Sequence, residues 1–248
     1  MEIKVLAING SPRKGNSEFL ARKALEEAEK NKDFSVKTEL YSFRGKEFKP
    51  CLGCGYCFQN EGDCVQKDDF APLKNKWLNS DVILYSVPVY HMSMPGQVKC
   101  FIDRLGNSFF PTFQPFFKEG QETIPKLLKV VGSIAQGLHI FSGQEHTITD
   151  LINHALVMQS IPVVGDLWES YIGVGGWTNN VDSRNALEEE YKKGDFDADI
   201  TVRATERLTQ RAIEMAAIVK TGAGGQREIF SKQPHYLPLL EQLRKQGV

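Results

Sequence analysis

The sequence lacks long hydrophobic runs and clusters of basic residues, and each absence excludes a class of protein. No apolar stretch approaches the ~20 residues that a membrane-spanning helix requires. The 30 Lys and Arg residues are balanced by 31 Asp and Glu residues, which gives a net charge of −1. Without a basic patch, electrostatic binding of nucleic acid or of an anionic membrane is not expected. We therefore expect neither nucleic acid nor a membrane as a partner.

Internal repeats, low-complexity segments and a recognisable targeting signal are also missing. The opening stretch, MEIKVLAI, is too short and carries the wrong charge for a signal peptide. We therefore expect a cytoplasmic protein, in which cysteines stay reduced and serve metal or redox chemistry rather than a disulfide framework. At 248 residues and 41% hydrophobic composition, the chain is long enough for one large α/β domain with appendages.

Cysteine is scarce, but four of the five cysteines lie within fourteen positions. The spacing C-x2-C-x2-C-x6-C joins Cys51, Cys54, Cys57 and Cys64 in one loop over residues 51–64. Thiolates are soft metal ligands, and three of them at this spacing followed by a fourth favour an iron–sulfur cluster. Zinc sites more often pair two C-x2-C units across a longer spacer. A cluster is the leading interpretation, while zinc, redox thiols, a disulfide pair or an unused set of ligands remain open.

A polar loop with the composition of a phosphate site follows the first predicted strand. Residues 3–8 form an apolar run typical of a buried parallel strand, and a helical pattern extends from about residue 17 to 31. Free backbone N–H groups and the helix dipole bind phosphate at such a junction. Without Walker A or G-x-G-x-x-G patterns a nucleoside triphosphate is not expected, and the alternative is a plain turn that caps the helix. The side chains that would add donors or charge are Ser11, Arg13, Asn16 and Ser17.

Two further loops follow predicted central strands, where open α/β sheets bind ligands, and their composition suits a flat aromatic ring. Counting the polar loop over residues 9–17 as the first, the second loop contains Pro88, Val89, Tyr90, Met92 and Ser93, and the third loop contains Ser142, Gly143 and Gln144. The alternative is a pair of hydrophobic turns that only pack on their neighbours. A lone loop histidine such as His91 is usually solvated, and Cys100 is expected to be buried on a helix. We therefore predict no catalytic acid–base residue.

Five apolar segments alternate with helical patterns and predict a doubly wound parallel sheet with right-handed connections. The segments are residues 3–8, 34–42, 81–87, 126–135 and 161–167. In the strand order 2-1-3-4-5 the three loops meet at one edge of the sheet, beside the switch point. A phosphate site next to two ring-binding loops suits a mononucleotide with a flat ring system, and FMN is the most economical choice.

Several short motifs also resemble a known family. Residues 10–17 (GSPRKGNS), 86–90 (SVPVY) and 99–104 (KCFIDR) together are similar to the NADPH-dependent FMN reductase group of flavodoxin-like proteins. The cysteine loop and the following residues 65–70 (VQKDDF) resemble the iron–sulfur flavoprotein branch of that group. The resemblance covers roughly residues 1–170. It implies a flavodoxin-like, five-stranded parallel sheet. Beyond the part that the resemblance covers, the helical pattern of residues 198–220 predicts a C-terminal helical extension.

The resemblance also implies positions for the cofactors. FMN phosphate would sit at Ser11, Arg13, Asn16 and Ser17, and the isoalloxazine would lie against Pro88, Val89, Tyr90, Met92 and Ser93. The stretch Ser142-Gly143-Gln144 is similar to one that lines the flavin in related quinone reductases, with Ser142 in place of a glycine. The thiolates of Cys51, Cys54, Cys57 and Cys64 would hold a [4Fe-4S] cluster.

Together these features predict an FMN-dependent oxidoreductase that binds and orients redox cofactors. Electrons would come from NAD(P)H or a redox protein and pass to a small acceptor, namely a quinone, nitro or azo compound. The alternatives are a non-enzymatic flavin and iron–sulfur electron carrier, or a zinc- or redox-sensing module. We expect residues 1–185 to form the FMN-binding domain. Residues 186–248 would form a helix and tail that contact a partner in a homodimer or homotetramer.

Overall fold

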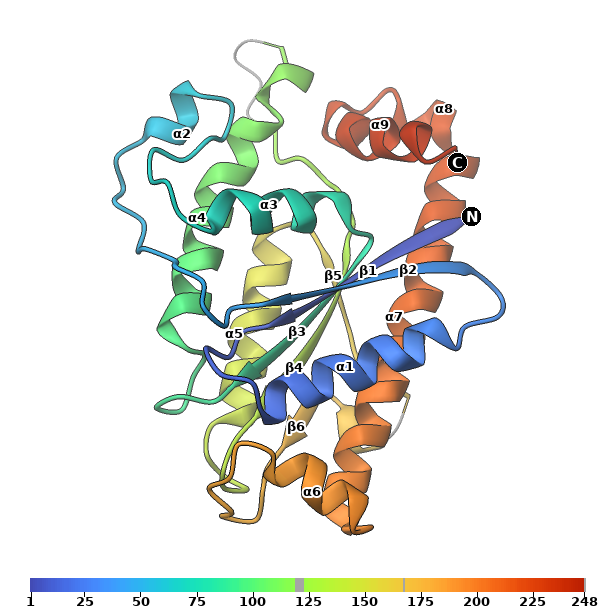
Figure 1. Cartoon of the computed structure of the whole chain (residues 1–248). Helices are drawn as coiled ribbons and strands as arrows, with labels where there is room; N and C mark the ends of the chain where they lie inside the picture. Colours follow the sequence, from blue (N-terminus) through green and yellow to red (C-terminus); the bar gives the residue numbers. More distant parts are fainter. Residues whose placement is uncertain (119–122, 167, 248) are drawn as a thin grey trace.

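The computed structural model describes residues 1–118, 123–166 and 168–247, which form a parallel sheet covered by helices on both faces (Figure 1). The strand order is β2-β1-β3-β4-β5, with β6 also paired to β4. Every one of these strand pairs is parallel. The strands are β1 (Glu2–Asn9), β2 (Ser35–Ser42), β3 (Val82–Pro88), β4 (Val130–Gln136), β5 (Ile161–Val163) and β6 (Val174–Gly176). The predicted strand order and doubly wound topology are confirmed.

The outer edge of the sheet differs from the prediction, because two short strands share the position of the fifth. β5 pairs with the first half of β4, and β6 pairs with its second half. The predicted strand over residues 161–167 is wrong beyond Val163, and residue 167 itself lies outside the described residues. At Gly165 a Cβ atom would lie 2.6 Å from Ser170 Oγ and 3.1 Å from Leu208 N. The chain therefore leaves the sheet where it passes close to a helix.

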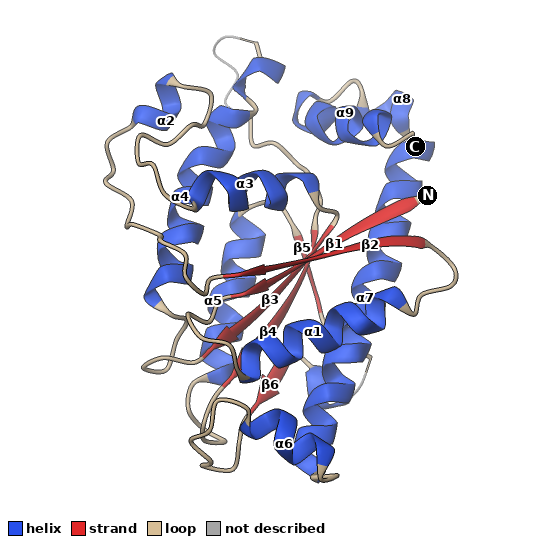
Figure 2. Ribbon diagram, in the orientation of Figure 1, coloured by secondary structure: helices blue, strands red, loops and turns tan. Residues whose placement is uncertain are grey.

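Two helical layers enclose the sheet, as Figure 2 shows. In β3, Val82 and Leu84 face one layer while Ile83, Tyr85 and Val87 face the other, which is the two-residue period of a strand buried on both sides. The first layer consists of α1 (Asn16–Glu29) and α7 (Phe196–Gly225); the second consists of α3 (Phe70–Asn79), α4 (Gly96–Thr112) and α5 (Gln144–Val157).

The remaining helices are short and lie at the periphery. They are α2 (Tyr56–Gln59), α6 (Ala186–Lys192), α8 (Arg227–Phe230) and α9 (Leu237–Lys245), with 3-10 turns η1 (Gln114–Phe116), η2 (Trp168–Ser170) and η3 (Pro234–Tyr236). Within the described ranges, no helix has both the length and the apolar character needed to cross a membrane.

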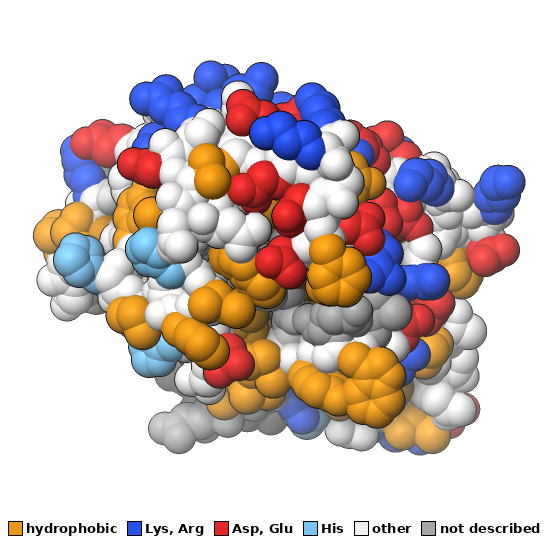
Figure 3. Space-filling view, turned by 90° about the horizontal axis from the view of Figure 1, so that it is seen from below, with side chains coloured by type: hydrophobic (Ala, Val, Ile, Leu, Met, Phe, Trp, Pro, Cys, Tyr) orange, Lys and Arg blue, Asp and Glu red, His pale blue; other side chains and the backbone are white. Residues whose placement is uncertain are grey.

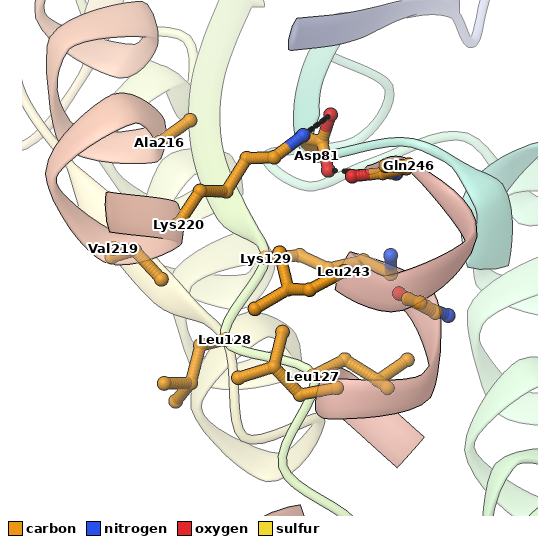
Figure 4. Close-up of a pocket in the computed structure, with 11 residues that line it drawn as sticks. Asp81, Leu127, Leu128, Lys129, Ala216, Val219, Lys220, Leu243 and Gln246 are labelled. Atoms are coloured by element: carbon orange, nitrogen blue, oxygen red, sulfur yellow. Dashed lines mark hydrogen bonds and ion pairs between the residues drawn. The ribbon is translucent and has the colours of Figure 1, made fainter. Parts of the chain in front are cut away.

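The C-terminal extension is helical, as predicted, and a buried ion pair ties it to the sheet. Lys220 of α7 lies 3.0 Å from Asp81 and donates a 2.7 Å hydrogen bond to the backbone oxygen of Glu2. Figure 4 shows Lys220 and Gln246 reaching Asp81 from two sides, above Leu127 and Leu243. The cavity between these residues is only about 20 Å³. The division at residue 185 stays a prediction, although α7 packs along α1 and β4.

A histidine between the sheet and α5 makes the stability of the fold sensitive to acid. The Tyr85 hydroxyl lies 3.0 Å from Trp77 Nε1 and 3.3 Å from His154 Nε2. Burial lowers the pKa of His154 from 6.5 to about 4. Between pH 6.5 and about pH 4, His154 is therefore protonated in the unfolded chain but neutral in the folded chain. The free energy of unfolding falls as the pH drops through this range.

We expect the free energy of unfolding to fall by at most about 3 kcal/mol from this group between pH 6.5 and pH 4. His154→Phe should flatten that part of the profile in urea denaturation at a series of pH values. His146→Gln removes an exposed histidine from the same helix and serves as the control. Equal pH slopes in His154→Phe and the wild type would contradict the prediction.

Candidate functional site

The first polar loop is held in place by hydrogen bonds from its own residues. Gly10 N donates to Ser86 O (2.9 Å), which ties the loop to the end of β3. Ser11 N donates to Asn9 Oδ1 (3.1 Å), and Arg13 N donates to Ser11 Oγ (3.2 Å). Ser11 is buried and Arg13 is exposed. The loop thus has a fixed backbone and a cationic side chain free to reach an anion at the start of α1.

Asn16 has a role that its sequence position did not indicate. Its Oδ1 accepts a hydrogen bond from Leu187 N (3.1 Å), and its Nδ2 lies 3.5 Å from Ser183 O. Asn16 therefore fastens the first turn of α6 and the segment before it to the start of α1, and it also lines a cavity.

A cavity of about 200 Å³ joins the first loop to the ends of β3 and β4. Its walls include Ser11, Arg13, Asn16 and Ser17 from the first loop and Pro88, Val89 and Tyr90 from the second. Further wall residues were not among the predicted site residues: Gln136, Gly137 and Leu138, which begin the third loop, and residues of the segment 178–184. The polar Gln136 at the end of an apolar strand was a usable signal. No local signal indicated Arg184, whose backbone oxygen would lie 2.5 Å from a Cβ at Gly15.

The chemistry of the cavity suits a ligand with a phosphate at one end. Arg13, Lys14 and Arg184 are exposed cations around the first loop, with Asp182 as the acidic residue among them. At the other end, Gln136 is buried, and its Oε1 has no hydrogen-bond partner in the part of the chain that the structure describes. A buried acceptor without a donor is costly, and a ligand N–H group would satisfy it. These features fit FMN, which carries both a phosphate and a ring N–H.

The second and third loops touch each other beside a larger cavity of about 490 Å³. Gly143 has a φ of +104°, and a Cβ there would lie 2.4 Å from Met92 Cα. Met92, Gly143 and Gln144 line this cavity, as do the aromatic side chains of Phe141, Trp168, Tyr171 and Trp177. The structure therefore brings the two predicted ring-binding loops together at one edge.

Two of the predicted residues line neither cavity. Ser93 Oγ donates to Asp150 Oδ2 (2.5 Å), which fixes the second loop to α5. Ser142 Oγ donates to His139 O (2.9 Å) and its backbone N–H to Gln144 Oε1 (3.0 Å), which shapes the third loop. Their part in ligand binding stays a prediction, and the structure places both in support of the loops.

Exposed aromatic side chains surround the larger cavity. Phe141 is 89% exposed and Trp168 is 82% exposed. In Figure 3, which views the molecule from below, hydrophobic side chains gather across the middle of the face while Lys and Arg crowd its upper margin. Such exposure of large apolar groups is typical of a binding surface.

The four clustered cysteines line a separate cavity of about 120 Å³ against α4. All four thiols are free. Asn107 of α4 contacts two of them: its backbone oxygen lies 3.5 Å from Cys57 Sγ, and its Nδ2 lies 3.6 Å from Cys51 Sγ. Burial raises the pKa of the Cys57 thiol, and the neighbouring Cys51 and Cys64 add to the rise.

The thiols surround a cavity rather than a point. Among the described residues, no three His, Cys, Asp or Glu side chains are arranged to hold a metal ion. A single zinc ion needs its ligands at one centre, whereas each thiolate of a four-iron cluster binds a different iron atom. The four thiols around one cavity supply the number and type of ligands that a four-iron cluster requires.

The two candidate sites lie near opposite ends of α4. The loop with Met92 precedes Gly96, the first residue of α4, whereas Arg104 and Asn107 line the cysteine cavity. The helix between Gly96 and Asn107 is about 16 Å long at the usual rise per residue. Figure 1 shows the same separation, with α2 on one side and the loops after β3 and β4 on the other.

A doubly wound parallel sheet with a cationic loop and an aromatic cavity at its carboxyl edge defines a flavodoxin-like, mononucleotide-binding class of protein. Comparison with known proteins narrows the class. The NADPH-dependent FMN reductase family matches residues 3–169. The chain belongs to this family and is an oxidoreductase of the FMN reductase type.

Relatives and solved structures agree with this placement. An iron-sulfur flavoprotein of Methanocaldococcus jannaschii is 34% identical over 66% of this chain and 77% of its own length. An iron-sulfur flavoprotein of Archaeoglobus fulgidus is 29% identical over 88% of this chain and 98% of its own. The fold is similar to that of RosB, solved with an 8-demethyl-8-formylriboflavin-5'-phosphate intermediate, with a TM-score of 0.58 and 15% identity over 91% of this chain and 87% of RosB.

Proposed function

We propose that this chain uses FMN to pass electrons from NAD(P)H, or from a redox protein, to a small acceptor such as a quinone, nitro or azo compound. The observation that carries the proposal is the cavity that joins the cationic first loop to Tyr90 and to Gln136, whose Oε1 has no hydrogen-bond partner among the described residues. FMN supplies the redox chemistry when it is bound. The protein has to bind, orient and shield it.

Different residues around the cavity would bind the phosphate and the ring system of FMN. Arg13 and the backbone N–H groups at the start of α1 would hold the phosphate, because a cation and a helix N-terminus both favour an anion. Ser11 keeps the loop in shape through its contact with Arg13 N. Pro88, Val89 and Tyr90 would support one side of the ring system, and Gln136 would accept a hydrogen bond from a ring N–H. The adjoining aromatic cavity would admit the acceptor.

We further propose that Cys51, Cys54, Cys57 and Cys64 hold a [4Fe-4S] cluster. The support is the single cavity that these four thiols line and the iron-sulfur flavoproteins among the relatives. The cysteine cavity and the flavin loops are separated along α4. The second candidate function is therefore that of an electron carrier between protein partners. A homodimer or homotetramer is also proposed, and its size is to be measured directly.

Anaerobic purification followed by analysis of FMN, iron and acid-labile sulfide tests the cofactors. NAD(P)H oxidation with quinone, nitro and azo acceptors tests the reaction. Stoichiometric FMN with turnover of at least one acceptor supports the proposal. Bound FMN without turnover of any acceptor would favour the electron-carrier function. Bound zinc without acid-labile sulfide would contradict the proposed cluster.

The double substitution Arg13→Ala with Ser11→Ala should weaken FMN binding by about 30- to 1,000-fold. This corresponds to about 2–4 kcal/mol for the loss of one charged contact and of the hydrogen bond that shapes the loop. Titration of the apoprotein by flavin fluorescence measures the effect. Arg44→Ala, which removes an exposed cation just after β2 that does not line the cavity, is the control. Unchanged affinity in the double variant would show that the first loop is only a turn.

A further inference from the structure

A buried arginine joins two sequence motifs beneath the cysteine cavity. Arg104, the last residue of the motif 99–104, is 2% exposed. Its Nη1 forms a 2.5 Å ion pair with Asp68 of the motif 65–70, and both side chains are almost completely buried. The guanidinium also stacks on the Phe70 ring at 4.3 Å. The packing of α4 against the start of α3 does not by itself require a charge at this depth.

The same guanidinium reaches the cysteines. Arg104 Nη2 donates to Cys64 Sγ at 3.2 Å, and Nη1 donates to Lys49 O at 3.3 Å, just before Cys51. Its Nε is buried and has no hydrogen-bond partner in the described part of the chain. Arg104 therefore keeps donor capacity in the wall of the cysteine cavity that protein groups do not fully use.

A second buried cation lies on the same side of the loop. Lys74 of α3 is 5% exposed and donates a 2.7 Å hydrogen bond to Gly62 O, two residues before Cys64. The buried carboxylate in contact with these cations is Asp68, which pairs with Arg104. While the thiols are neutral, the buried groups behind the cavity thus carry an excess of positive charge. Such an excess is costly unless negative charge fills the cavity.

We infer that Arg104 is the buried counter-charge for an anionic group held by the four cysteines, and that it sets the reduction potential of that group. The inference rests on the proposed cluster. A thiolate-bound cluster is anionic and gains one further negative charge on reduction. A cation within hydrogen-bonding distance of a ligand sulfur therefore stabilises the reduced form more and raises the potential. Asp68 opposes this effect by partly neutralising the guanidinium.

Opposite shifts in two variants test this role. Arg104→Gln should lower the midpoint potential of the cluster, because it removes the cation. Asp68→Asn should raise it, because the guanidinium keeps its full charge. Arg104→Lys should lie nearest the wild type. The measurement is a redox titration of the anaerobically purified full-length protein, monitored by the EPR signal of the reduced cluster, with iron and sulfide analysis of each sample.

Lys99→Gln is the control, since Lys99 is an exposed cation of α4 that pairs with Asp103. It should leave the potential unchanged. If Arg104→Gln does not fold, an upward shift of the midpoint potential in Asp68→Asn still tests the inference. In the double variant Arg104→Gln with Asp68→Asn, which removes both charges, the potential should return toward the wild-type value. Equal potentials in all variants, or shifts of one sign in both single variants, would overturn the inference alone. Wild-type protein without iron and sulfide would overturn the proposed cluster and this inference together.

Discussion

Gly62→Ala is expected to lower the free energy of unfolding by about 3–5 kcal/mol and to detach the cysteine loop from α4. Gly62 has a φ of +83°, and a Cβ there would lie 1.9 Å from Thr112 Oγ1 and 2.5 Å from Ser108 O. The helix backbone cannot move away cheaply, so the loop must. Gly62 O accepts hydrogen bonds from Lys74 Nζ and Ser108 Oγ, and a displaced loop would leave that buried ammonium group without its partner.

Gly55→Ala separates the two costs of this substitution. Gly55 lies in the same loop with a similar φ of +71°, but nothing lies within 4 Å of its Cβ position. It should therefore show only the backbone cost of about 1–2 kcal/mol. Urea denaturation measures both variants, and their iron content after reconstitution reports on the loop. Equal destabilisation in the two variants would mean that the contact with α4 contributes nothing.

The central sheet could be predicted from the sequence because each strand carries its own signal. Residues 82–88 form a run that is apolar except for Ser86, and such runs occur in strands buried on both faces. The fifth strand was predicted at its start and in its place beside β4, but its end at Val163 and the extra strand β6 were not, since β5 and β6 contain three residues each and depend on pairing with β4. The departure at Gly165 is caused by the approach of Leu208, which is remote in sequence.

The candidate flavin site shows the same division. Each of the three loops directly follows an apolar segment that predicts a strand. The first loop and the loops containing Tyr90 and Gly143 could therefore be located from the local sequence. The wall from residues 178–184 depends on contacts such as that of Asn16 with Leu187, which no local pattern encodes. Side-chain roles were also hidden: Ser93 belongs to a hydrogen bond with Asp150 that only the packing of α5 creates.

The position of the cysteine loop likewise depends on tertiary packing. The segment after β2 turns away from the flavin loops because Phe43 and Phe48 stack on each other with ring centroids 4.3 Å apart. Both rings also contact Phe101 of α4 edge-on. This aromatic cluster directs the chain along α4 to the Arg104 end. If the proposed cluster and FMN are both bound, electrons passing between them within one chain would have to cross roughly the length of that helix.

Gly143→Ala is expected to weaken FMN binding by about 100-fold and to lower the free energy of unfolding by about 3 kcal/mol. Gly143 has a φ of +104°, and a Cβ there would lie 2.4 Å from both Cα and O of Met92. Both atoms belong to the backbone, so the loops that meet at this point must separate. Met92 itself has a φ of +68°, which leaves its backbone little freedom to adjust.

Two glycines give matched controls for this substitution. Gly45 has a φ of +72°, and nothing lies within 4 Å of its Cβ position. Gly45→Ala therefore measures the backbone cost without a steric clash. Gly175→Ala places its Cβ 3.5 Å from Gln144 Cβ, an ordinary contact in the same cavity. Both should keep FMN affinity within about threefold of the wild type, because neither added methyl group pushes the two loops apart; a threefold change corresponds to about 0.7 kcal/mol. A destabilised Gly143→Ala protein with unchanged FMN affinity would show that the contact between the two loops supports the fold and does not shape the flavin site.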